Sequence, residues 1–119
     1  MAQKKVRESL SIGVAEKDRI NILRCSGYID SDNYMILSDA IDSLFDSGAY
    51  RIVVDLSDID YISSAGWGIF LGNLKRAAVN GGDIRLAGMH ENVREIYDLL
   101  NLENLVAAYN TAEEAVRFD

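Results

Sequence analysis

The stretch RIVVDLSDIDYISSAGWGIFLG, residues 51–72, decides how this chain folds. It opens with a short β-branched run that hardly alternates with polar residues, which is typical of an interior strand buried on both faces. We expect that strand to end at residue 56 and a loop to occupy residues 57–62. Residues 64–78 then repeat apolar side chains at spacings of three and four, which predicts a helix. The stretch therefore predicts a strand, a loop and a helix in succession.

The flanking sequence continues this alternation of strands and helices. Residues 10–14 and 20–29 hold two short alternating runs joined by a polar turn, which predicts a starting β-hairpin. The residues at 30–32, Asp-Ser-Asp, all suit the N-cap of a following helix. Further helices are expected at about 33–47, 91–100 and 111–117, and further strands at 83–87 and 105–107. The sequence predicts an α/β fold with a mixed sheet, a parallel centre and four helices.

Two serines, Ser63 and Ser64, stand where the predicted loop turns into the predicted helix. A serine at this place can simply cap the helix by accepting a hydrogen bond from a backbone amide. The free amides and the positive dipole end also stabilise negative charge, so a phosphate on a serine can be held locally. Gly66 and Gly68 each cost about 1 kcal/mol relative to alanine inside a helix. Their presence indicates close packing of the helix start against the sheet, and the place of Trp67 on the apolar stripe favours packing too.

Two short motifs carry a resemblance to a known family. They are YISSAGWG at residues 61–68, which follows Asp-Leu-Ser, and GYID at residues 27–30. This pattern resembles the STAS domain, and most of all the free-standing anti-sigma-factor antagonists of bacteria. In that family the first motif usually runs aromatic, aliphatic, Asp, Ser, Ser or Thr, Gly, Leu, Gly, which places Ser64 on the phosphorylated serine. The departures are Ser63 for Asp, Ala65 for Ser or Thr, and Trp67 for Leu.

The resemblance implies a regulatory protein and not an enzyme. The unmodified form would bind an anti-sigma factor that is also a serine kinase, and phosphorylation of Ser64 would release it. A serine phosphatase would restore the active form, and ATP would be bound by the kinase, so no cofactor is expected on this chain. The residues expected to bind the partner are Asp30, Ser57, Asp58, Tyr61, Ser63, Ser64, Gly66 and Trp67.

Composition excludes several other classes of function. The net charge of −7 disfavours binding to nucleic acid or to anionic membranes, because both depend on lysine and arginine. Cys25 is the single cysteine and His90 the single histidine, so neither an internal disulfide nor a metal site is expected. Residues 1–7 are expected to form a flexible tail and residues 8–119 one domain. With no membrane-length apolar run, the protein is expected to be cytoplasmic.

Three alternatives stay open on the sequence. A response-regulator receiver would use Asp55 at its strand end, but the acidic pair and the final lysine of that class are absent. A hydrolase using Ser64 would need a base, and it lacks the Gly-x-Ser-x-Gly elbow. The third alternative keeps the STAS fold in another role, as a scaffold subunit of a stress-signalling complex or of a lipid or anion transporter.

Overall fold

The structure, a computed structural model, describes residues 9–117. The tail expected at residues 1–7 lies outside this range. The elements follow in the order β1 Leu10–Lys17, β2 Ile20–Ile29, α1 Tyr34–Asp46, β3 Arg51–Ile62, α2 Ser64–Val79, β4 Asp83–Ala87, α3 Glu91–Leu99, the 3₁₀ helix η1 Leu102–Asn104, β5 Ala108–Tyr109 and α4 Ala112–Ala115. Within the described range, no helix combines the length and the apolar character that crossing a bilayer requires.

The strands form one sheet in the order β1-β2-β3-β4-β5. β1 and β2 are antiparallel, and every other neighbouring pair is parallel. The hairpin turn consists of Asp18 and Arg19, both with positive φ, which is the backbone of a type I′ turn. The expected mixed sheet with its starting hairpin and parallel centre is confirmed.

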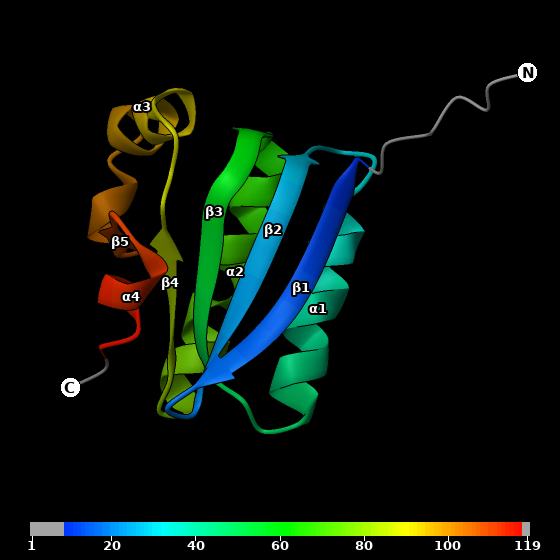
Figure 1. Cartoon of the computed structure of the whole chain (residues 1–119), viewed down its shortest axis with the longest axis vertical. Helices are drawn as coiled ribbons and strands as arrows, with labels where there is room; N and C mark the ends of the chain where they lie inside the picture. Colours follow the sequence, from blue (N-terminus) through cyan, green and yellow to red (C-terminus); the bar gives the residue numbers. More distant parts are fainter. Residues whose placement is uncertain (1–8, 118–119) are drawn as a thin grey trace, which may run out of the picture.

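The two faces of the sheet are covered unequally (Figure 1). α1 and α2 lie along one face, whereas the short α4 lies against the other face near β4 and β5. The main core fills the space beneath α1 and α2 and includes Leu23, Ile41, Val54, Phe70 and Ile84, all fully buried. A smaller cluster lies beneath α4, around Val53 and Ala115. Among the helices of residues 9–117, none therefore covers the second face of β1 and of the adjoining part of β2.

β3 is longer than the sequence predicted, and the expected loop at residues 57–62 is wrong. The pairs Arg24–Asp55 and Ser26–Asp58 show that β3 spends one residue more than β2 over this interval. A second extra residue lies between the pairs Gly27–Ile59 and Ile29–Ile62. These two β-bulges break the two-residue alternation of side chains on which the prediction of a strand depends, so the sequence pattern predicts a loop here instead.

Two further expectations need correction. α1 begins after Asn33, so none of residues 30–32 is its N-cap. The last strand comprises residues 108–109 instead of 105–107, because Leu102–Asn104 form a 3₁₀ turn that delays it. Two helix ends are capped: Gly48, with φ of +86°, follows the last turn of α1, and the Thr111 hydroxyl accepts a hydrogen bond from the Glu114 amide in the first turn of α4.

Candidate functional site

The candidate site lies at the carboxyl ends of β2 and β3, where ligands and partners of open α/β sheets gather. Ile29 and Ile62 are register partners at these ends, and the Ser63 amide donates to the Ile29 carbonyl over 2.8 Å. This bond continues the ladder one step past β3. It brings Asp30, which follows Ile29, next to the serine pair that opens α2.

The two serines have different local roles. Ser63 is the N-cap of α2, with extended backbone, and its hydroxyl accepts from the Gly66 amide over 3.4 Å. Ser64 is the first helical residue; its side chain is exposed and makes no hydrogen bond within residues 9–117. Of the two serines, Ser63 is therefore the one that caps the helix. The Ser64 hydroxyl is left without a hydrogen-bond partner at the strand-to-helix junction, within residues 9–117.

Asp30 is held in place by a hydrogen-bonded loop. Its carboxylate accepts from the amides of Asp32 and Asn33, over 2.9 and 3.1 Å. The buried Asn33 side chain accepts from the Asp30 amide and donates to the Tyr28 carbonyl and the Ser9 hydroxyl. Asp30 is thus held both through its carboxylate, by the Asp32 and Asn33 amides, and through its own amide, by the Asn33 side chain. Sequence reasoning missed Asn33, although a short polar residue just before an apolar helical face was a usable signal.

Gly66 and Trp67 lie beneath the site, not on its surface. A Cβ on Gly66 would lie 2.7 Å from Ile29 Cγ2 and 2.8 Å from Ile62 Cγ2, so only glycine lets α2 approach the two strand ends this closely. Trp67 is buried and packs edge-on against Phe70, with ring centroids 6.0 Å apart. The close packing that the sequence favours for both residues is what the structure shows, and their binding to a partner stays a prediction. Gly68 differs, because no atom lies near where its Cβ would be.

The remaining expected residues divide between two places. Tyr61 is 54% exposed one residue before the end of β3, close to the serine pair in the chain. Asp58 is exposed at the first bulge, opposite Ser26. Ser57 lines a hollow on the α4 face of the sheet, where its hydroxyl donates to the Asp55 carboxylate over 2.7 Å. The structure therefore does not bring Ser57 next to Ser64, so Ser57 lies outside the surface around Ser64 that the sequence predicts as one interface.

Exposed apolar side chains adjoin the Asp30 loop, and sequence reasoning missed them as well. Met35 and Ile36, in the first turn of α1, are 50% and 44% exposed. The helical pattern did not indicate a binding role for them, because Tyr34 and Leu37 already form the buried face of this turn. With Tyr61 they give this end of the molecule apolar side chains beside carboxylates and a free hydroxyl.

A known protein family matches most of this chain. The family model described as the STAS domain matches residues 11–115. The chain belongs to the STAS domain family. Among curated relatives, this STAS domain is 23% identical to the anti-sigma-B factor antagonist of Bacillus subtilis over 109 residues, which cover 92% of this chain and 99% of that one.

Solved STAS structures share the fold. An anti-sigma factor antagonist from Mycobacterium paratuberculosis superposes with a TM-score of 0.83 at 22% identity, covering 91% of this chain and 92% of that one. The anti-sigma factor antagonist SpoIIAA in its unphosphorylated form gives a TM-score of 0.74 at 20% identity, covering 89% and 93%. SpoIIAA has also been solved in its phosphorylated form, with a TM-score of 0.68 at 18% identity, covering 89% and 96%.

Proposed function

We propose that this STAS domain is an anti-sigma-factor antagonist that is switched by phosphorylation of Ser64. When Ser64 is unmodified, the protein binds an anti-sigma factor that is also a serine kinase, and this binding frees a sigma factor for transcription. The observation that carries the proposal is the exposed, unbonded Ser64 hydroxyl at the first position of α2, beside Asp30. In this role the domain is a cytoplasmic regulator, and the chemistry belongs to its partners.

The start of α2 suits a phosphorylated side chain. The amides of Ser64 and Ala65 stand in the first turn, where a helix has no acceptor for them, and the helix dipole is positive at that end. A phosphate on Ser64 is thus stabilised without any change of fold. The curated relatives and the phosphorylated SpoIIAA structure support the proposal by analogy.

Phosphorylation would weaken binding by placing charge inside an interface. A phosphoserine carries about −1.5 to −2 charges near neutral pH. On this surface it would add charge near Asp30, at the end of the sheet where Met35 and Tyr61 are exposed and a partner would have to desolvate them. Each 1.4 kcal/mol of repulsion or of added desolvation cost lowers the affinity for the partner about tenfold, so two such increments suffice for a switch.

The transfer is balanced if the kinase supplies ATP. The Ser64 Oγ forms a bond to the γ-phosphorus, the bond from that phosphorus to the β–γ bridging oxygen breaks, and ADP leaves. The hydroxyl proton passes to a base of the kinase. A phosphatase that acts on phosphoserine then hydrolyses the Oγ–P bond with water, which restores the free hydroxyl and releases inorganic phosphate.

The test uses the protein from its own host and matched variants at the two serines. We expect intact mass spectrometry to find a phosphorylated fraction that maps to Ser64, that disappears in Ser64→Ala and that persists in Ser63→Ala. A co-purifying ATPase-type kinase should release wild type on addition of ATP but retain Ser64→Ala. Phosphorylation that persists in Ser64→Ala would refute the site. Co-purification with a membrane transporter or a stress-signalling assembly that ATP does not dissociate would replace the antagonist by a scaffold role.

A further inference from the structure

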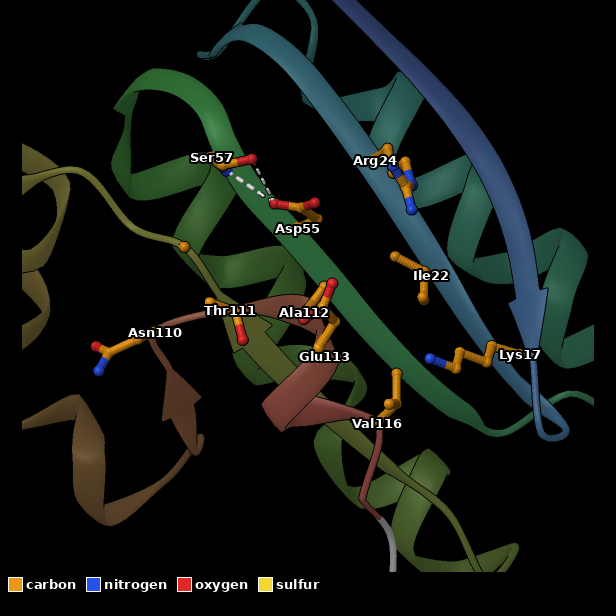
Figure 2. A pocket seen from close by; sticks show the side chains of 11 residues that line it. Lys17, Ile22, Arg24, Asp55, Ser57, Asn110, Thr111, Ala112, Glu113 and Val116 are labelled. Atoms are coloured by element: carbon orange, nitrogen blue, oxygen red, sulfur yellow. Dashed lines mark hydrogen bonds between the residues drawn. The ribbon is translucent and has the colours of Figure 1, made fainter.

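A hollow of about 360 Å³ lies on the sheet face that α4 only partly covers (Figure 2). It runs between β2 and the start of α4, above the middle of β3. Its volume falls within the range of small-molecule sites in proteins, about 300–1,000 Å³. Ser57 belongs to this hollow, so the hollow is separate from the surface that carries Ser64.

The walls of the hollow are fixed by close packing. Gly88, just after β4, has φ of +72°, and a Cβ there would lie 3.1 Å from Ser57 Cβ and 3.4 Å from an Asp55 carboxylate oxygen. Ile22 from β2 and Val116 beyond α4 supply apolar surface. The hollow therefore has a polar side, where Ser57 holds the Asp55 carboxylate, and an apolar side at Ile22 and Val116.

Charged side chains of both signs, Lys17, Arg24, Asp55 and Glu113, line this hollow, and no salt bridge joins them within residues 9–117. Arg24 and Asp55 are register partners on β2 and β3, and both line the hollow. One Asp55 oxygen is occupied, because it accepts from the Ser57 amide over 3.0 Å and from the Ser57 hydroxyl over 2.7 Å. Within residues 9–117 neither Arg24 nor the nearby Lys17 forms a salt bridge, although the chain carries more carboxylates than cations.

We propose that this hollow binds a small zwitterion of the α-amino acid type. Arg24 and Asp55 stand at paired positions on neighbouring strands, whose backbones lie about 4.8 Å apart, so the hollow presents a cation and a carboxylate from adjacent positions. The ligand carboxylate pairs with Arg24, and its ammonium pairs with the second Asp55 oxygen. An aliphatic side chain of the ligand lies against Ile22 and Val116. This inference goes beyond the proposed switch and does not depend on it.

The test compares L-leucine with two analogues that each lack one charge, 4-methylpentanoate and 3-methylbutylamine. Each is titrated into the full-length protein while backbone amide resonances are followed by NMR. We expect L-leucine to shift the resonances of residues 22–24, 55–57 and 111–113 saturably, and each analogue to bind about tenfold more weakly, the effect of losing one ion pair. Arg24→Gln should weaken L-leucine binding by a similar factor, and Lys75→Gln, an exposed cation on α2, should not.

Each contrary result has a definite meaning. Absence of saturable shifts with L-leucine overturns the proposal. Equal binding of 4-methylpentanoate and L-leucine also overturns it, because the hollow would then recognise only an anion. Unchanged binding in Arg24→Gln would overturn the assignment of the carboxylate contact; since Arg24 is exposed, this variant is expected to fold normally.

Discussion

The two halves of β3 teach different lessons about how sequence specifies a strand. Residues 52–55 pair in register with both β2 and β4, and Ile52, Val53 and Val54 are all buried. Residues 57–62 pair with β2 alone and contain two bulges, so the core positions Leu56, Ile59 and Ile62 recur every three residues. The first half builds the sheet, and the second half bends the chain so that it delivers Ser63 and Ser64 to the start of α2.

The largest expected effect tests whether the bulged half is packed as firmly as the regular one. Ile52→Ala and Ile59→Ala both remove a fully buried side chain, one from each half. Each should lower the free energy of unfolding by about 2–5 kcal/mol, through lost burial and the cavity left behind. Chemical denaturation of both variants gives the comparison. A loss of less than about 1 kcal/mol for Ile59→Ala alone would mean that the second half is loosely attached.

The next effect tests the contact between α2 and the bulged strand end. Gly66→Ala should destabilise the protein by about 1–3 kcal/mol, because its Cβ would overlap Ile29 and Ile62. Gly68→Ala is the matched control, two residues along the same helix and with open space at its Cβ. It should stabilise the protein by up to about 1 kcal/mol through better helix propensity. Equal thermal unfolding of the two variants would contradict the close approach at Gly66.

Cys25 reports on the first bulge, because it lies between the β2 residues that pair on either side of it. Burial, with a smaller contribution from the Asp55 charge, raises the pKa of its thiol from 9.0 to about 12. Between these values the unfolded chain loses a proton that the folded chain keeps. Stability should therefore fall by up to about 1.4 kcal/mol per pH unit as pH rises through this window.

The measurement is denaturation at pH 8–11 for wild type and Cys25→Ala, whose stability should fall less steeply. At neutral pH, thiol labelling of the folded protein should occur no faster than global unfolding. Faster labelling would show that the bulge opens locally while the rest of the sheet stays intact.

The smallest effect separates the two serines at the end of the bulged half. Ser63→Ala removes the N-cap of α2 and should cost about 0.5–1 kcal/mol, since its hydrogen bond to the Gly66 amide is long. Ser64→Ala should change stability by less than about 0.5 kcal/mol, because its hydroxyl has no partner within residues 9–117. Thermal melts of the two variants test this order, and a larger loss for Ser64→Ala would contradict it.

Much of the fold was predictable because most elements follow a regular period. Apolar spacing gave α1, α2 and α3, and alternation gave the hairpin, so a mixed sheet with a parallel centre followed from ordinary connection rules. The prediction failed at residues 57–62 because each bulge adds a residue that the two-residue period does not contain. It also failed at β5, where a strand of two residues carries no periodic signal.

The candidate site was predictable only in part. A serine at a strand-to-helix junction is visible in sequence, and the structure places Ser64 there, exposed. The sequence did not place Ser57 on the other side of the sheet, because its pattern assigned this residue to a loop; as part of β3, Ser57 shares the face of Asp55. It also did not reveal Asn33, whose role depends on reaching Ser9 across a separation of 24 residues.

Because β3 contains two extra residues, the length of the segment 57–62 decides which residue stands at the first position of α2. Deleting one residue between 57 and 62 would remove a bulge and draw the chain back by about 3.3 Å, so that Ser64 would fall on the capping place and Ala65 on the first helical position. The free hydroxyl would vanish although no serine had been mutated. Homologous sequences should therefore vary in composition at the exposed positions of this segment while keeping its length.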